Sequence, residues 1–212
     1  VSPEVVIKAK GKDDPDSLMS YIAAMKRIYK PTTQFEYSCL NFITLQNVLQ
    51  NITGMTLADY AQKNIFDVLG MTNTTYMPKN KPEILAKVAP TEKQPNGECF
   101  LGEVHDPLAR VMNHGNSGNA GVFSCAEDLA VLAAALMNGG NYNGIQVLGK
   151  NTVDVMTQVP AGFEHIGRSL GWDNYSDYNS NQGNLFHKTR TFGHTGYTGT
   201  SFIVDPVSKT AV

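Results

Sequence analysis

The chain has 212 residues, enough for one large domain or two small ones. Hydrophobic residues make up 42% of it and charged residues 17%, a balance typical of globular proteins that bury a core. The net charge of -2 gives no electrostatic reason to expect nucleic acid or an acidic membrane as a partner. No apolar run approaches the roughly 18 residues of a membrane span, and three widely spaced cysteines argue against a disulfide framework and a zinc site.

The first half of the chain predicts three amphipathic helices, over residues 16–29, 42–52 and 56–69. Gly54 follows the second helix and Gly70 follows the third, which is where a glycine C-cap is expected. The apolar stripe of the second helix comprises Phe42, Leu45, Leu49 and Ile52.

After the third helix, the sequence predicts long loops, then two helices, and finally strands. Residues 76–123 are rich in proline, glycine and asparagine, so we expect long ordered loops, which are often functional. Ser124-Cys125-Ala126-Glu127 has the pattern of a capping box and predicts a helix to Met137, with a shorter helix over 151–158. Strands are predicted at 169–172 and 192–206, separated by a polar loop at 174–190. Helices followed by antiparallel strands indicate an α+β fold.

Tyr37-Ser38-Cys39 is the first candidate site, between the turn at Pro31 and the second helix. Tyr37 could project from the approach to the helix as a functional phenol. Alternatively, Tyr37 is a core aromatic and Ser38 is only the N-cap of the helix. Taken alone, the motif favours this structural interpretation.

Two loop motifs allow similar alternatives. His105 and Asp106 could form an acid–base pair, but adjacent side chains rarely converge on one substrate atom, so a turn before Pro107 is favoured. The glycine-rich loop 114–121 lacks the Gly-Lys-Ser/Thr ending of a phosphate-binding loop, which excludes a nucleotide site of that kind. We expect instead a backbone that packs closely beside a cleft.

The stretch FGHTGYTGTSFIVDP, residues 192–206, combines a glycine-rich start with a strand-forming end. On an edge strand, His194 and Gly196 would point to one face and Thr195 to the other. Glycine at 196 would leave space for a substrate along the strand, and backbone N–H groups there could hold an oxyanion. A surface histidine on a glycine-rich hairpin is an equally good interpretation of these residues.

Together these segments resemble the serine β-lactamase-related family, which includes class C β-lactamases, penicillin-binding DD-peptidases and related esterases. Residues 35–78 resemble its helical region, with Tyr-Ser-Cys in place of Tyr-Ser-Asn and Val-Leu-Gly-Met in place of "PLGM". Residues 102–140 resemble its "HDP…GxAGLFSTAxDLA" segment. His-Thr-Gly at 194–196 matches the third motif, usually Lys-Thr-Gly. The resemblance covers nearly the whole chain in the right order.

The resemblance implies a mechanism in which a serine attacks an acyl carbon while a lysine and a tyrosine handle its proton. It implies that Tyr37 is this catalytic tyrosine and that His194 takes the place of the usual lysine of the third motif. Thr195, Gly196 and Tyr197 would bind substrate, with the backbone N–H of Tyr197 as half of the oxyanion hole.

Two departures from the family pattern matter. Cys39 stands where the family has an asparagine that binds substrate. Because a thiol is a weak hydrogen-bonding group, this change favours an esterase or peptidase over a strong β-lactamase. Cys39 itself is disfavoured as the nucleophile, because the sequence shows no evident base to activate it. In addition, no serine is followed three places later by lysine, so the nucleophilic Ser-x-x-Lys is absent from the chain.

We therefore expect residues 1–212 to be the central and C-terminal part of one β-lactamase-like domain, with helices and long loops over 1–160 and sheet strands over 161–212. A missing N-terminal segment of the same domain would supply the serine, and the chain alone would be inactive. The resemblance implies no cofactor or metal, a small-molecule or peptidoglycan-like substrate, and action in the periplasm or at the cell surface of a bacterium. The alternative is a non-catalytic domain that binds peptidoglycan or a peptide.

Overall fold

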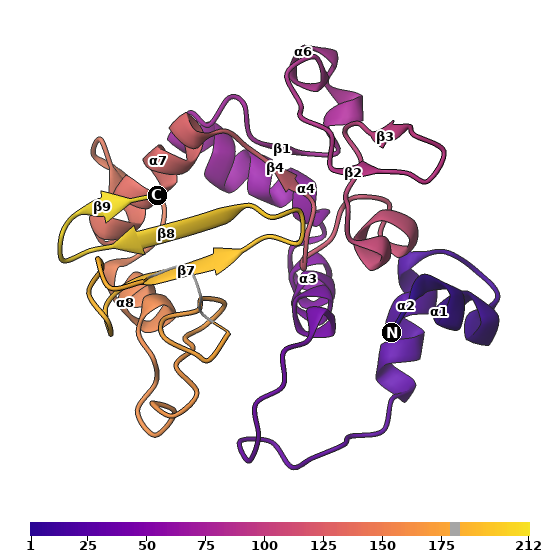
Figure 1. Ribbon diagram of the computed structural model, residues 1–212, viewed down its shortest axis with the longest axis horizontal. Helices are drawn as coiled ribbons and strands as arrows, with labels where there is room; N and C mark the ends of the chain where they lie inside the picture. The colour runs from indigo at the N-terminus through magenta and orange to yellow at the C-terminus, as the bar shows by residue number, and fades with distance from the viewer. Residues whose placement is uncertain (179–182) are drawn as a thin grey trace. The chain divides into compact units, whose positions relative to one another are not determined.

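The computed structural model describes residues 1–178 and 183–212 (Figure 1). The chain divides into two compact units: unit 1 comprises residues 1–63 and 73–123, and unit 2 comprises residues 64–72 and 124–212. Both units combine helices with short antiparallel sheets, so the predicted α+β class is confirmed. In the part of the chain that the structure describes, no helix is both long and apolar enough to cross a bilayer.

Unit 1 is mainly helical. Its helices are α1 (Pro3–Lys10), α2 (Pro15–Ala24), α3 (Cys39–Thr53), α4 (Leu57–Ala61) and α6 (Pro82–Leu85), with a 3-10 turn η2 (Pro78–Asn80) and a π-helix η3 (Leu108–Met112). Strand β1 (Thr75–Tyr76) pairs with β4 (Val122–Phe123), and β2 (Glu92–Lys93) pairs with β3 (Cys99–Phe100), both antiparallel. The core of the unit consists of Val6, Leu18, Ile43, Leu108 and Met112. Helices α1, α2, α3 and η3 are therefore held together by one shared set of apolar side chains.

The first predicted helix is too long. Helix α2 ends at Ala24, and the predicted continuation to residue 29 is irregular. Leu18 is fully buried in the core, whereas Met25 and Ile28 are exposed. The helix ends where its apolar face no longer has a partner, because helices of this length depend on tertiary packing.

Helix α3 ends at the predicted Gly54 cap but begins at Cys39, three residues before the predicted start, and it buries a different face. Gly54 closes the helix in the left-handed conformation, with φ of 66°. Phe42, Leu45 and Ile52 of the predicted stripe are 41%, 56% and 78% exposed, while Ile43 and Gln46 are buried. The next helical segment starts at Thr56 and ends at Gly70 as predicted, though η1 (Gln62–Phe66) interrupts it as a π-turn between α4 and α5 (Asp67–Leu69).

Unit 2 packs two helices against a small sheet. After α5 it contains α7 (Ala126–Met137), the hairpin β5 (Asn141–Tyr142) with β6 (Ile145–Gln146), and α8 (Lys150–Thr157). The sheet has the order β7-β8-β9, formed by β7 (Phe192–Thr195), β8 (Ser201–Asp205) and β9 (Thr210–Ala211). Its core consists of Ala133, Leu136, Val153, Phe192 and Val204. Phe192 and Val204 come from the sheet, and the core therefore anchors β7 at its first residue.

Three predictions for unit 2 are wrong. The strand predicted at 192–206 is two antiparallel strands, β7 and β8, joined by a turn at 196–200. The N-cap of α7 is Cys125 rather than Ser124, and its side chain makes no capping hydrogen bond. Residues 169–172 form a tight turn instead of a strand, closed by the Ser169 N–H donating to the Trp172 carbonyl at 3.1 Å. Gly171 has φ of 90°, which is incompatible with an extended strand. The loop predicted at 174–190 includes residues 179–182, which lie outside the described residues.

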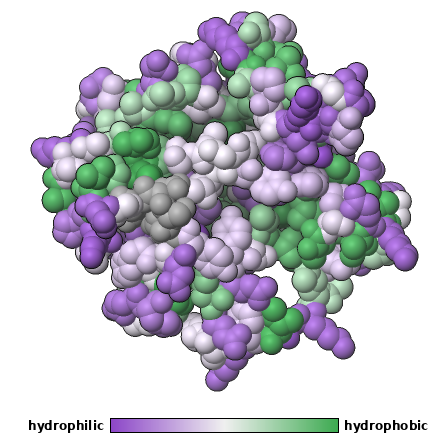
Figure 2. Space-filling view, in the orientation of Figure 1, coloured by the Kyte–Doolittle hydropathy of each residue, from purple (hydrophilic) through white to green (hydrophobic). Residues whose placement is uncertain are grey.

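Apolar side chains also reach the surface. On the face drawn in Figure 2 they form several separate patches among hydrophilic residues. The exposed members of α3 are Phe42, Leu45, Val48 and Ile52. Phe42, Leu45 and Ile52 belong to the apolar stripe predicted for this helix, so they share one helical face.

Candidate active site

The tyrosine motif lies at the start of α3. Ser38 is the N-cap, and its hydroxyl oxygen accepts a hydrogen bond from the Leu40 N–H at 3.3 Å. This confirms the capping role that the sequence favoured for Ser38. The Tyr37 side chain is half exposed rather than buried, so the interpretation of Tyr37 as a core aromatic is wrong. Its phenol lies at the surface of unit 1, directly before a fixed helix start.

Cys39 is the first residue of α3, and its surroundings disfavour a thiolate. Burial raises the pKa of the Cys39 thiol, a hydrogen bond from the Asn119 side chain lowers it, and the negative charge of Asp106 raises it again. Since the thiolate is the nucleophilic form of cysteine, the raised pKa argues against Cys39 as a nucleophile. All three cysteines of the chain are free thiols.

His105 and Asp106 have separate partners. Asp106 Oδ1 accepts a hydrogen bond from the Ala109 N–H at 2.8 Å, at the start of η3, and another from Asn119 Nδ2 at 3.1 Å. His105 Nε2 instead lies 3.6 Å from Glu92 Oε1. The two side chains do not form an acid–base pair, and the structural role that the sequence favoured for Asp106 is confirmed.

The glycine-rich loop 114–121 packs directly on α3. A Cβ atom at Gly118 would lie 2.1 Å from the carbonyl oxygen of Phe42, so only glycine fits there. The Gly118 N–H donates to Gln46 Oε1 at 2.8 Å, and Gln46 Nε2 donates to the Asn116 carbonyl at 2.7 Å. The close backbone approach predicted for this loop is therefore present, and Gln46 is buried because it binds the loop.

The motif His194-Thr195-Gly196 lies at the end of β7 in unit 2, with His194 and Thr195 in the strand. His194 pairs with Phe202 of β8, and Thr195 pairs with Ser201. On the other edge of β7, Gly193 exchanges both backbone hydrogen bonds with Asp173, at 3.0 and 2.8 Å. Hydrogen bonding alternates along an antiparallel strand, so the backbone of Thr195 is directed to that same outer edge. His194 Nδ1 lies 2.7 Å from the Thr195 carbonyl oxygen, which fixes the ring against this edge.

Gly196 closes the β7–β8 hairpin. Its N–H donates to the Thr200 carbonyl at 2.7 Å. A Cβ atom at Gly196 would lie 2.2 Å from Thr200 Oγ1, so the side chain of Thr200 favours glycine at this position. Tyr197 follows at the tip and is 68% exposed. The motif thus presents Thr195 and Tyr197 to solvent at the end of a strand that is anchored in the core of unit 2.

The six candidate residues therefore fall into two groups. Tyr37 and Cys39 belong to unit 1, and residues 194–197 belong to unit 2. Sequence reasoning missed Asn119, whose side-chain amide donates to Asp106 Oδ1 at 3.1 Å. Only its place in a glycine-rich loop could have drawn attention to it. Within residues 1–178 and 183–212, no three histidine, cysteine, aspartate or glutamate side chains are arranged to hold a metal ion.

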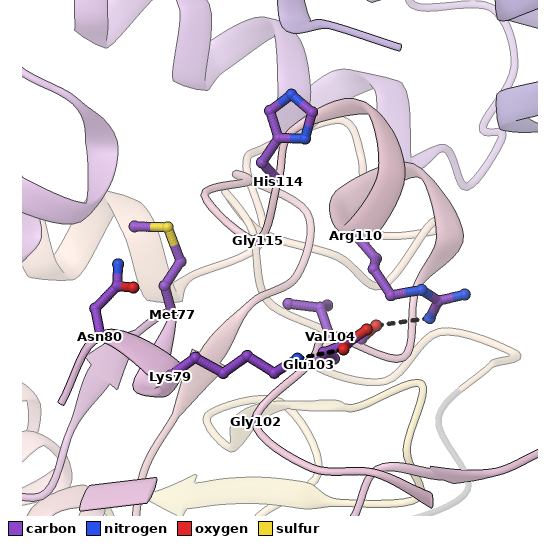
Figure 3. Close-up of a pocket in the computed structure, with 9 residues that line it drawn as sticks. All are labelled: Met77, Lys79, Asn80, Gly102, Glu103, Val104, Arg110, His114 and Gly115. Carbon is purple, nitrogen blue, oxygen red and sulfur yellow. Dashed lines mark hydrogen bonds and ion pairs between the residues drawn. The ribbon is translucent and has the colours of Figure 1, made fainter. Parts of the chain in front are cut away.

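A separate pocket of about 350 Å³ lies elsewhere in unit 1 and includes none of these six residues (Figure 3). Lys79 and Glu103 form an ion pair along its wall. The Arg110 guanidinium donates to the carbonyl oxygens of Val104 and His105 at 2.7 and 2.8 Å and stacks on the Phe100 ring. The charged groups of this pocket are thus partnered within the protein, and we assign it no ligand.

Comparisons with known proteins agree with one another. The family model named Beta-lactamase matches residues 5–212. Two proteins named "Putative D-alanyl-D-alanine carboxypeptidase" are similar in sequence: the one from Escherichia coli strain K12 is 31% identical over 198 residues, and the one from Salmonella typhi is 30% identical over 197. Each match covers 87% of this chain and 45% of the relative. The chain therefore spans less than half the length of these curated relatives.

Solved structures show the same fold. The octameric penicillin-binding protein homologue from Pyrococcus abyssi matches with a TM-score of 0.65 and 18% identity, over 94% of this chain and 42% of that one. The penicillin-binding protein from Bacillus halodurans matches with a TM-score of 0.65 and 18% identity, over 93% of this chain and 56% of that one. At such identities the likeness shows the fold alone, which is that of β-lactamases and penicillin-binding proteins.

Proposed function

The chain belongs to the beta-lactamase family, and we propose on this basis that it forms part of a serine hydrolase that cleaves an amide or ester through an acyl-enzyme. The observation that carries the proposal is the placement of Tyr37. Its phenol is half exposed immediately before the capped first turn of α3, which suits a group that exchanges a proton with a substrate-bound nucleophile.

In the proposed reaction, a serine hydroxyl adds to the acyl carbon and its proton passes to Tyr37. The leaving group departs with a proton, and water then releases the acyl group from the serine. The serine comes from a Ser-x-x-Lys outside residues 1–212, since none occurs within them. His194 supplies a hydrogen bond or positive charge beside the reacting groups. The Tyr197 N–H stabilises the negative charge that develops on the acyl oxygen.

We propose a peptide of the peptidoglycan type as the substrate. The two relatives carry the name "Putative D-alanyl-D-alanine carboxypeptidase", which supports a peptide ending in D-alanine. Cys39 lacks the carboxamide of the family motif, so an ester or peptide is favoured over rapid turnover of β-lactams. Such a substrate places the reaction in the periplasm or at the cell surface of a bacterium.

A second candidate function is binding without catalysis. The absence of Ser-x-x-Lys from the 212 residues and the thiol at Cys39 both favour it. In that case the chain would bind peptidoglycan or a peptide and leave it intact.

Labelling experiments separate the two candidates. The full-length polypeptide encoded by the gene and the 212-residue chain are each treated with a fluorescent penicillin and a fluorophosphonate. The hydrolase proposal predicts that a serine outside residues 1–212 is labelled in the full-length polypeptide, that Tyr37→Phe slows labelling strongly, and that the 212-residue chain stays unlabelled. Absence of any labelled serine in the full-length polypeptide, together with binding of unlabelled peptidoglycan, would establish the binding function instead.

A further inference from the structure

A chain of hydrogen bonds in unit 1 connects the loop after η3 to the first residue of α3. Asn113 Nδ2 donates to Ser117 Oγ at 2.7 Å, and the Ser117 hydroxyl donates to Asn119 Oδ1 at 2.7 Å. The Asn119 amide donates to Asp106 Oδ1 at 3.1 Å and also hydrogen-bonds the Cys39 side chain. Asn113 and Ser117 are buried, so this end of the chain of hydrogen bonds is shielded from water.

These contacts fix the orientation of the Asn119 carboxamide. Its oxygen accepts from Ser117, and one of its two N–H groups is held by Asp106. Asp106 is itself fixed, because the same carboxylate oxygen accepts from the Ala109 N–H at 2.8 Å. Exchanging the oxygen and nitrogen of the amide would break both contacts, so the remaining N–H is the group available to the Cys39 sulfur.

We propose that Asn119, oriented by Asp106, is a positioning residue for the Tyr37-Ser38-Cys39 motif. This role rests on the proposed function. The Asn119 amide holds the side chain of the first residue of α3, and the backbone that carries Tyr37 enters the helix through that residue. The family motif has an asparagine at position 39; here the thiol has replaced it, and Asn119 brings a carboxamide to the same place from the neighbouring loop.

The contact has an electrical signature on the thiol that a purely structural role would not produce. Burial raises the pKa of Cys39, the Asn119 hydrogen bond lowers it, and the Asp106 charge raises it. The remaining influences are the backbone N–H of Cys39 and the amino-terminal charge of the chain, which both lower the pKa. Removing the N–H of Asn119 should therefore raise the midpoint at which Cys39 titrates, and removing the charge of Asp106 should lower it.

A reciprocal exchange isolates the contact with Cys39. The single variant Asn119→Asp places two carboxylates side by side and should destabilise the fold. Adding Asp106→Asn restores a hydrogen bond between positions 106 and 119 with donor and acceptor reversed. The bonds from Ser117 and Ala109 are kept, because both are donated to oxygen atoms that remain. Only the N–H directed at Cys39 is lost from the double variant. Asn96→Asp, at an exposed position whose amide contacts Glu98, is the matched surface control.

Three measurements are made on the full-length polypeptide encoded by the gene: the midpoint of urea unfolding, the rate of acylation by a fluorophosphonate, and the titration of the Cys39 13Cβ chemical shift in cysteine-labelled protein. Cys99→Ser and Cys125→Ser assign the resonances. In the double variant we expect recovery of stability, a Cys39 midpoint above that of the wild type, and acylation slowed between about threefold and tenfold, the worth of one hydrogen bond. The surface control should match the wild type in all three.

The outcomes distinguish the two levels of the argument. If the wild type and the double variant are acylated at equal rates, or share one Cys39 midpoint, the positioning role is overturned while the hydrolase proposal stands. If the wild-type polypeptide is not acylated at all, the proposed function fails and the positioning role fails with it.

Discussion

Gly118→Ala is the sharpest test of how the glycine-rich loop is attached to α3. The added Cβ would lie 2.1 Å from the Phe42 carbonyl oxygen and 3.0 Å from the Gln46 Cβ, and the first of these is a backbone atom that cannot rotate away. The loop must therefore move and release the 2.8 Å hydrogen bond from the Gly118 N–H to Gln46. Overpacking and the loss of one partly buried hydrogen bond together should lower the free energy of unfolding by about 2–4 kcal/mol.

The assay is urea unfolding, compared with Gly149→Ala as a control. The nearest atom to a Cβ at Gly149 is Thr152 Oγ1 at 3.7 Å, an ordinary contact. Because Gly149 is the N-cap of α8, where alanine is disfavoured, the control should lose no more than about 1 kcal/mol. Amide exchange of the Gly118 N–H should also accelerate in Gly118→Ala. A free energy of unfolding for Gly118→Ala equal to that of the control would refute the attachment of this loop to α3.

Three further predictions concern single positions. Ser38→Ala should cost about 0.5–1 kcal/mol of stability in urea unfolding, because the cap to the Leu40 N–H is lost and its 3.3 Å length is on the weak side. Burial raises the pKa of Tyr76 to about 12, above the value of about 10 for an unfolded tyrosine. The neutral phenol therefore contributes up to about 2–3 kcal/mol to the free energy of unfolding below pH 10, and this contribution is lost as the pH rises to 12. Tyr76→Phe should abolish this part of the alkaline loss of stability, measured by urea unfolding at each pH. Gly196→Ala should lower the melting temperature, because the new Cβ would lie 2.2 Å from Thr200 Oγ1. Adding Thr200→Ala removes that oxygen and should restore most of the melting temperature; no recovery in the double variant would contradict the hairpin geometry.

Helix boundaries were predictable where a single residue type fixes the backbone. Gly54 and Gly70 end their helices with φ of 66° and 70°, a conformation that glycine adopts without strain. The signal is local, and therefore visible in the sequence. The strand predicted at 169–172 failed for a related reason, because the glycine at 171 turns the chain there.

The buried face of α3 could not be predicted from periodicity. Three of the four residues of its apolar stripe are exposed, while polar Gln46 is buried by hydrogen bonds to a loop 70 residues further along the chain. In the same way, the hydrogen bond from Asn119 Nδ2 to Asp106 Oδ1 joins two segments that show no common pattern in the sequence. Motif order identified the family, but the hydrogen bonds that connect one motif to another depend on tertiary packing.

The most direct test of the hydrolase proposal is to locate the acyl group. The full-length polypeptide is reacted with a slowly released penicillin, digested, and sequenced by mass spectrometry, with Tyr37→Phe in parallel. We expect the adduct on a serine in a Ser-x-x-Lys outside residues 1–212, formed far more slowly in Tyr37→Phe. An adduct on Cys39 or on a serine within residues 1–212, or equal rates for the wild type and Tyr37→Phe, would contradict it.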